Sequence, residues 1–305
     1  MLPAVIFMKK EQLTGILQIL TATLIWGCAF VAQSVGMEHI GPMTFQAARS
    51  LLAVLTMIAV IPVMDRDRTQ FLSKWQDKAL WKAGILCGLA LFAAQSLQQM
   101  GLQYTEPGKA GFITAMYIVL VPVLGLFLGR RCGWRVWVSV ALAVAGLYLL
   151  SCVGVTKIAL GDLLILISAG AFAVQILLID VLAQSLDGLR LNCIQFLVVA
   201  VLSGLAALFA ETPTLSGIVD CAVPLLYTGV LSSGAAFSLQ ILGQQHLPPE
   251  PASLIMSLES VFAVLSGWLI LHQTLSLHEG LGCCLVFAGV ILCQTKTDNQ
   301  PLPPS

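Results

Sequence analysis

Apolar runs separated by short polar breaks extend along almost the whole chain. Each run approaches the ~20 residues that a helix needs to cross the hydrocarbon core of a bilayer. Ten such runs can be distinguished, at residues 14–35, 44–64, 80–102, 108–128, 134–152, 160–183, 189–210, 219–243, 250–271 and 278–294. Lipid offers no partners to backbone polar groups, and runs of this length are too long for barrel strands. The pattern therefore predicts an all-α membrane protein with ten transmembrane helices.

The composition supports a lipid bilayer as the environment of the chain. Of its 305 residues, 58% are hydrophobic and only 10% are charged, whereas about a quarter of a soluble domain is charged. The formal net charge is zero, so nothing indicates a nucleic-acid partner. Most of the nine cysteines lie in apolar runs without regular spacing. We expect them to be small hydrophobic residues rather than disulfides or metal ligands.

Lysine and arginine are distributed unevenly between the two ends of the predicted helices. With the N-terminus placed inside, twelve of them fall in inner segments and only Lys109 and Lys157 in outer loops, while Arg49 lies inside a helix. Positive charge concentrates on the cytoplasmic side of membrane proteins. We therefore expect a multi-pass protein of the cell membrane with both termini in the cytoplasm. The polar, proline-rich tail at 295–305 is expected to be disordered.

The sequence repeats itself at an offset of 142 residues. The matched pairs include Ser96 with Ser238, Gln98 with Gln240, Gly101 with Gly243, Pro107 with Pro249, Tyr117 with Glu259 and Gly125 with Gly267. Toward the start of each copy the alignment is weak, with Trp26-Gly27 near Phe172-Ala173. These matches predict two repeats, at 14–152 and 160–294, each holding five of the predicted helices.

Five helices is an odd number, so the second repeat must enter the membrane from the opposite side. Two inverted repeats are the signature of a secondary transporter, in which related halves exchange conformations and open a central site to each side in turn. Ser96 and Gln98 would then lie in the outer third of the membrane, and Ser238 and Gln240 in the inner third. Our hypothesis is that they are related positions on two sides of one pathway.

Two ionisable side chains stand inside predicted helices. An ionised side chain at the membrane centre costs about 2.5–3.5 kcal/mol on insertion scales, so Glu259 should face protein or a water-filled cavity. It is a proton carrier or the partner of a substrate amine, or else a protonated acid bonded to a neighbouring helix. Arg49 binds a substrate carboxylate or an acid in the cavity, or else snorkels to the outer headgroups.

Uncharged polar and aromatic residues complete the candidate substrate-binding site. The amides are Gln33, Gln95, Gln98, Gln175 and Gln240, and the aromatic residues are Trp26 and Tyr117, which both stand away from the predicted interfaces. The alternative for the amides is a purely structural role as inter-helix hydrogen bonds, worth about 0.6–2 kcal/mol each. Both interpretations remain open at this stage.

Several kinds of chemistry find no support in the sequence. There is no Gly-x-x-x-x-Gly-Lys phosphate loop, so ATP is not expected to drive the protein directly. The four histidines lie at predicted helix ends without metal-ligand spacing, and no serine–histidine or paired-aspartate constellation falls in the membrane core. We therefore expect neither an enzyme nor a bound cofactor or metal.

Between about residues 14 and 294 the chain resembles the EamA-type members of the drug/metabolite transporter superfamily. The matching stretches are Trp26-Gly27-Cys28-Ala29-Phe30-Val31, Arg49-Ser50-Leu51-Leu52-Ala53, Phe112-Ile113-Thr114-Ala115, Ala145-Gly146-Leu147, Ser257-Leu258-Glu259-Ser260-Val261-Phe262-Ala263 and Phe287-Ala288-Gly289-Val290. The family commonly has Pro where this chain has Ser260, and often has Gly-Glu where this chain has Gly129-Arg130 and Leu271-His272. The resemblance implies a central cavity built from helices 1–4 and 6–9, with helices 5 and 10 at the periphery.

The residues and the resemblance together predict a secondary active transporter. Its expected substrate is a small metabolite, an amino acid or related compound, exported across the cell membrane by alternating access with proton coupling. The alternatives are a nucleotide-sugar or lipid-linked carrier of the same fold, which would need more cavity cations than Arg49 alone, and a non-transporting scaffold subunit. We expect a monomer or weak homodimer.

Overall fold

The computed structural model describes residues 10–65, 71–151, 159–271 and 276–294. Within these ranges every regular element is a helix, in agreement with the predicted all-α class. The tail predicted at 295–305 lies outside the described residues, as do Arg66, Arg68 and Lys157 of the predicted charge pattern.

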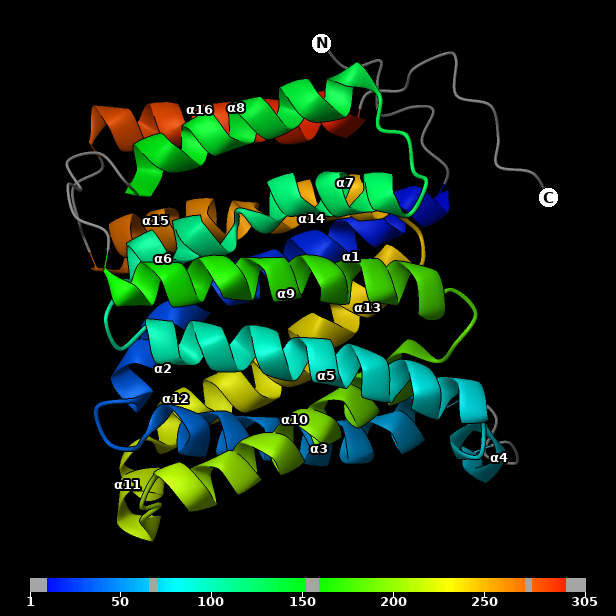
Figure 1. The fold of residues 1–305 in the computed structure, drawn as a ribbon, viewed down its shortest axis with the longest axis vertical. Coiled ribbons are helices and arrows are strands. Elements are labelled where there is room, and N and C mark those ends of the chain that lie inside the picture. Colours follow the sequence, from blue (N-terminus) through cyan, green and yellow to red (C-terminus); the bar gives the residue numbers. More distant parts are fainter. Residues whose placement is uncertain (1–9, 66–70, 152–158, 272–275, 295–305) are drawn as a thin grey trace.

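The helices follow one another in the order in which Figure 1 colours them. They are α1 (Lys10–Gly27), α2 (Ala29–Gly36), α3 (Pro42–Met64), α4 (Phe71–Trp75), α5 (Lys78–Gly101), α6 (Pro107–Thr114), α7 (Tyr117–Phe127), α8 (Trp134–Ser151), α9 (Leu160–Leu182), α10 (Gly188–Ala210), α11 (Leu215–Asp220), α12 (Ala222–Leu226), the π-helix η3 (Tyr227–Ala236), α13 (Phe237–Gln244), α14 (Pro249–Met256), α15 (Leu258–Leu271) and α16 (Leu277–Gln294).

Eight helical stretches of the described residues are long and apolar enough to cross a bilayer. They include Lys10–Gly36 and Ala222–Gln244, each of which combines consecutive helices, while Trp134–Leu150 of α8 is a shorter apolar helix. Large apolar side chains also face outward, with Phe209 90% and Phe127 84% exposed. The chain is therefore a multi-pass membrane protein, and the count of ten spans stays a prediction.

The helices lie side by side in an elongated stack. Helices α8 and α16 pack against each other at one edge, and α3 packs against α10 at the opposite edge. Helices α1, α5, α9 and α13 fill the middle, where α5 contacts α9 and α1 contacts α13. The pair α8–α16 thus occupies the peripheral position that the family resemblance implies for helices 5 and 10.

Four predicted helices are not continuous, and here the sequence-based prediction was wrong. The first breaks at Cys28, the fourth at Ala115–Met116 and the ninth at Ser257, while the eighth contains the π-helix η3. None of these break residues is Gly or Pro, so a pattern of apolar runs gives no sign of them. Ala115 and Ser257 are 142 residues apart, so this break occurs at matching positions of the two repeats.

Side chains from other helices support the wide turns of η3. The Trp26 indole Nε1 donates to the Ser232 carbonyl oxygen at 3.2 Å. The Asn192 amide donates to the carbonyls of Ser233 at 3.2 Å and Gly234 at 3.0 Å. Widened helical turns of this kind are frequent at functional sites. What reads in the sequence as a run of small residues is therefore a helix distortion held by α1 and α10.

Close glycine contacts recur in the two halves of the chain. A Cβ on Gly101 would lie 2.5 Å from Ile165 Cγ1 and 2.9 Å from the carbonyl oxygen of Gly161. A Cβ on Gly243 would lie at the same distances from Ile19 Cγ1 and the carbonyl oxygen of Gly15. Each of these last two residues precedes its counterpart by 146 positions. Helix α5 therefore packs on α9 as α13 packs on α1.

The same 146-residue offset extends to the next helix of each half. Helices α3 (Pro42–Met64) and α10 (Gly188–Ala210) have the same length, and both of their ends are 146 residues apart. The weak sequence match of Trp26-Gly27 with Phe172-Ala173 has this offset too. The contacts thus relate helices 1 and 2 of the first half to helices 6 and 7 at 146, and helices 3 and 4 to helices 8 and 9 at 142.

Candidate functional site

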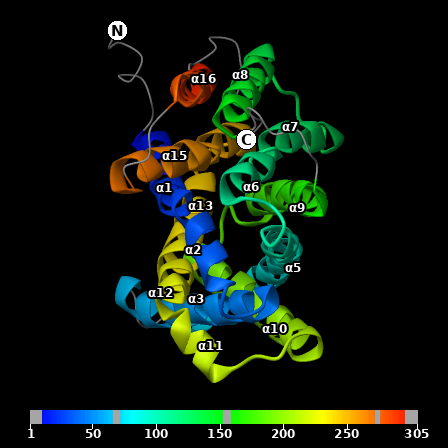
Figure 2. The same cartoon turned by 90° about the vertical axis from the view of Figure 1, so that its left-hand side faces the viewer.

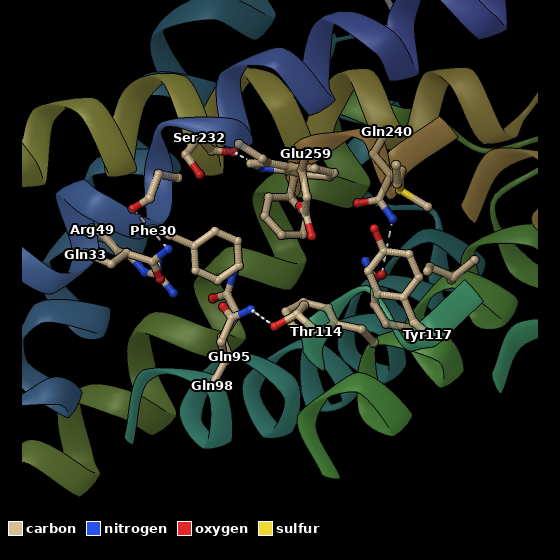
Figure 3. A pocket seen from close by; sticks show the side chains of 17 residues that line it. Phe30, Gln33, Arg49, Gln95, Gln98, Thr114, Tyr117, Ser232, Gln240 and Glu259 are labelled. Atoms are coloured by element: carbon tan, nitrogen blue, oxygen red, sulfur yellow. Dashed lines mark hydrogen bonds between the residues drawn. The ribbon is translucent and has the colours of Figure 1, made fainter. Parts of the chain in front are cut away.

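A cavity lies where the broken helices meet (Figure 3). Its walls come from α1, α2, α3, α5, α6, α7, α9, η3, α13, α14 and α15, so among the described residues α8, α10 and α16 supply none of the lining. Its volume is about 60 Å³ for the centre of a water-sized sphere. At roughly 10–15 Å³ of such volume per water molecule, this is room for about four to six waters.

Seventeen side chains line the cavity, and all nine predicted site residues are among them. The nine are Trp26, Gln33, Arg49, Gln95, Gln98, Tyr117, Gln175, Gln240 and Glu259. They come from seven of the ten predicted spans and are brought together only by the fold. Their role in binding a substrate stays a prediction.

Eight lining residues were missed by sequence reasoning. They are Ala29, Phe30, Thr114, Phe172, Ile176, Ser232, Phe237 and Met256. Most are apolar and look like core residues. The repeat could have found several of them, because Phe172, Phe237 and Met256 are the counterparts of Trp26, Gln95 and Thr114.

The lining is almost symmetric between the two halves of the chain. Fourteen of the seventeen residues form equivalent pairs at the offsets of 146 and 142: Trp26 with Phe172, Ala29 with Gln175, Phe30 with Ile176, Gln95 with Phe237, Gln98 with Gln240, Thr114 with Met256 and Tyr117 with Glu259. Only Gln33, Arg49 and Ser232 lack a counterpart in the lining. The shape of the cavity is therefore nearly two-fold, while its charges are not.

Arg49 is held inside the protein rather than at the membrane surface. It is 2% exposed, and its Nη1 donates to Gln33 Oε1 at 2.7 Å. Its Nε and Nη2 are buried and have no hydrogen-bond partner within the described residues, and no carboxylate there forms an ion pair with it. The snorkelling alternative is thus wrong. A buried guanidinium with unused donors is poised to receive an anionic group.

Glu259 lies on a different wall of the cavity (Figure 3). It is the second residue of α15, directly after the break at Ser257, and is 6% exposed. Its Oε1 is buried without a partner in the described part of the chain. Helix α1 approaches closely here, since a Cβ on Gly27 would lie 3.1 Å from the Glu259 carbonyl oxygen.

The lining amides have structural and unused atoms at the same time. Gln98 Nε2 donates to Thr114 Oγ1 at 3.0 Å, and Gln240 Nε2 donates to Gln175 Oε1 at 3.3 Å. The Oε1 atoms of Gln95 and Gln240, however, are buried and unpaired within the described residues. Inter-helix hydrogen bonding therefore accounts for part of these amides and leaves acceptors directed at the cavity region.

Ion pairs join helices at both ends of the molecule. Lys109 pairs with Asp162, and Arg130 pairs with Asp180, so both halves of the fourth predicted helix are tied to α9. Asp180 was expected to be solvated, and its pairing with Arg130 corrects that expectation. Among the described residues, no group of three or more His, Cys, Asp and Glu side chains is placed to hold a metal ion.

Arg190 forms a second such tie, between α10 and the end of α3. It is 1% exposed and pairs with Asp65 and Asp187. Its hydrogen bond to Asp65 lowers the pKa of that carboxyl to about 2. The sequence indicated only a topology-determining cation at this position, because a charge near a helix end does not show whether its partner is protein or water.

A buried polar cavity among interrupted apolar helices is the architecture of a membrane carrier. The family model of the EamA-like transporters matches residues 13–152 and 159–294. The chain therefore belongs to the EamA-like transporter family.

Relatives along nearly the full chain have transporter names. An "Uncharacterized transporter" from Archaeoglobus fulgidus is 29% identical over 289 residues, which cover 94% of this chain and 87% of the relative. The "Uncharacterized transporter YoaV" of Bacillus subtilis is 22% identical and covers 90% of this chain and 95% of its own. A "WAT1-related protein At3g02690, chloroplastic" from Arabidopsis thaliana is 23% identical over 90% of this chain and 68% of its own.

A solved structure described as "Crystal structure of protein" superposes with a TM-score of 0.77 at 17% identity, covering 92% of this chain and 96% of that one. This similarity shows the fold alone. The family and the names of the relatives indicate a membrane transporter rather than an enzyme.

Proposed function

We propose that the chain is a secondary active transporter that moves a small metabolite, an amino acid or related compound, across the cell membrane by alternating access. The observation that carries the proposal is the cavity itself, in which two buried, oppositely ionisable side chains stand on different walls without partners in the described residues. Arg49 offers Nε and Nη2, and Glu259 offers Oε1. A carrier that binds an amphoteric solute needs such a pair.

The size of the cavity fits a small solute. A water molecule takes up about 30 Å³ of liquid, so room for about four to six waters corresponds to about 120–180 Å³ of solute. The proposed substrate places an anionic group at Arg49 and a cationic group near Glu259, with its apolar part against Trp26 and Phe237, whose rings meet edge to face at 4.8 Å. In the proton-coupled form of the mechanism, Glu259 carries the proton when the substrate has left.

The recurring contacts of the two halves support the mechanism. The repeats proposed at 14–152 and 160–294 would be inverted, and an exchange of their conformations would open the cavity to each side in turn. In this proposal both termini are cytoplasmic, the transport direction is export, and the chain works as a monomer or weak homodimer. The near-symmetric lining of the cavity fits such an exchange, because equivalent residues take equivalent places.

Ligand-induced thermal stabilisation across a metabolite panel tests the proposal. The purified full chain should be stabilised by a few amphoteric metabolites, and these should be taken up by proteoliposomes that contain it. A scaffold subunit would show neither response. Stabilisation by nucleotide sugars but by no amino acid would favour the carrier alternative, which the structure supports less because Arg49 is the only cation in the described lining.

A further inference from the structure

A cluster of buried polar side chains lies between α3 and α5, next to the cavity. Gln46, Arg49 and Ser50 share one face of α3, and Gln95 and Gln99 stand one turn apart on α5. All five are at most 2% exposed. We call these five residues the Arg49 compartment. Arg49 and Gln95 also line the cavity, so the compartment is continuous with it.

The compartment contains an unusual concentration of unused hydrogen-bonding atoms. Buried without a partner in the described residues are Gln46 Oε1, Arg49 Nε and Nη2, Ser50 Oγ, Gln95 Oε1, and both Oε1 and Nε2 of Gln99. About nine-tenths of buried polar atoms in folded proteins are paired. A cluster of exceptions around a buried charge indicates a place built for something other than protein.

The second half of the chain supplies an internal comparison. Gln46 Nε2 donates to Ser96 Oγ at 3.0 Å. The equivalent residues are Asn192 and Ser238, and Asn192 Nδ2 donates to Ser238 Oγ at 2.8 Å. The same amide-to-serine bond thus joins α3 to α5 in one half and α10 to α13 in the other, so the two regions can be compared residue by residue.

The comparison shows that the fold does not require a polar compartment. The counterparts of Arg49, Ser50, Gln95 and Gln99 are Gln195, Phe196, Phe237 and Ile241. Phe196 and Phe237 stack edge to face at 5.2 Å, and Ile241 is fully buried. The second half therefore fills this space with apolar side chains, while the first half leaves room beside Ser50 and places a charge there.

We propose that the Arg49 compartment is a binding site for a small anion of the carboxylate class. In the loaded carrier the anion is the substrate's own carboxylate, and in the empty carrier it is a small anion from solution. Arg49 Nε and Nη2, Gln99 Nε2 and the Ser50 hydroxyl are the donors. The inference deepens the proposed function and rests on it only in assigning the bound anion to a transported substrate.

The test is thermal unfolding of the purified full chain at constant ionic strength, with sodium acetate or sodium chloride replacing sodium gluconate. The variants are Arg49→Gln and Gln99→Ile, which introduce the residue type that the second half has at the equivalent position. Ile241→Val is the matched control, since it alters a buried residue of the second half without touching the compartment. The acetate and chloride arms separate a site restricted to carboxylates from one that also takes free halide.

Acetate is expected to raise the unfolding temperature of the wild type and of Ile241→Val with the same apparent affinity. Arg49→Gln should weaken the acetate response about tenfold or more, as expected for a lost charged hydrogen bond, and Gln99→Ile should weaken it severalfold. If Arg49→Gln does not fold, Gln99→Ile decides.

The proposal is overturned if no small anion stabilises the wild type, if the response survives in Arg49→Gln, or if Gln99→Ile matches the wild type. Its failure can be told from that of the proposed function. Uptake of an amino acid by proteoliposomes with an unaltered Arg49→Gln variant would reject the compartment and keep the transporter. Acetate binding without transport of any solute would do the reverse.

Discussion

Substitution of Glu259 by Gln removes the charge and the titratable proton of the cavity while keeping the shape of the side chain. Glu259 is 6% exposed, and its Oε1 has no partner within the described residues. An ionised side chain at this depth costs about 2.5–3.5 kcal/mol on insertion scales, so its replacement by a neutral amide should not lower the unfolding temperature. Any loss of transport would then report on function rather than folding.

The expected size of the effect follows from the interaction that is lost. A hydrogen bond to a charged group contributes about 1.5–3 kcal/mol, and every 1.4 kcal/mol is a factor of ten in affinity. Binding of an amphoteric substrate by Glu259→Gln should therefore weaken by about 10- to 100-fold. Because the amide cannot release a proton, a pH gradient should no longer drive net uptake, while exchange at saturating substrate should persist.

The assay compares two modes of transport in proteoliposomes. Net uptake is measured under an imposed pH gradient, and counterflow exchange is measured without one. Tyr117→Phe is the matched control, because Tyr117 stands at the equivalent position of the first half and its substitution changes no charge. Gradient-driven uptake by Glu259→Gln at the wild-type rate would refute the role of Glu259 as proton carrier.

Two further predictions concern the scaffold. Gly101→Ala and Gly243→Ala should each lower the free energy of unfolding, by about 1–3 kcal/mol for overpacking, because each new Cβ would lie 2.5 Å from an isoleucine carbon; Gly170→Ala, with nothing within 4 Å, is the control, and equal unfolding temperatures for all three would contradict the packing. Arg190 lowers the pKa of Asp65 to about 2, below the unfolded value of about 3.9, so Asp65 stabilises the fold above about pH 4 and this stabilisation is lost as the pH falls toward about 2. Asp65→Asn should flatten the dependence of unfolding temperature on pH between about pH 5 and pH 2, and an unchanged slope would contradict the pairing.

Residues whose burial in lipid is expensive could be found from sequence. Arg49 and Glu259 stand out because few ionisable side chains occur inside apolar runs, and both line the cavity. The glutamines of the lining could be found for the same reason. Phe172 and Phe237 could not, because an aromatic residue in an apolar run is indistinguishable from a core residue until its neighbours are known.

The helix breaks depend on tertiary packing and were therefore beyond the sequence. Cys28, Ala115 and Ser257 interrupt their helices without a Gly or Pro at the break. The π-helix η3 is likewise supported by Trp26 and Asn192, which lie 206 and 41 residues from the carbonyls that they bond. An apolar pattern specifies that a segment spans the membrane and leaves open whether its backbone is regular throughout.

The alignment of the two halves became definite only with the structure. In sequence the match at 142 residues is carried by Gln, Pro and Gly, whereas the match of the first two helices at 146 rests on little more than Trp26-Gly27. The contacts of Gly101 and Gly243 fix both offsets at once. With them came the pairing of the lining residues and the contrast between the polar and apolar versions of one compartment.

The central claim is that the two halves open one cavity alternately to the two sides of the membrane. Its most direct test uses Ser96→Cys and Ser238→Cys, equivalent buried positions that accept the same kind of amide hydrogen bond, each in a background without the nine native cysteines. A membrane-impermeant thiol reagent is applied to one side at a time, with and without substrate. The account predicts reciprocal behaviour: conditions that raise the reactivity of Ser96→Cys from one side lower that of Ser238→Cys from the other. Reactivities that stay constant in every condition, or that rise and fall together, would contradict it.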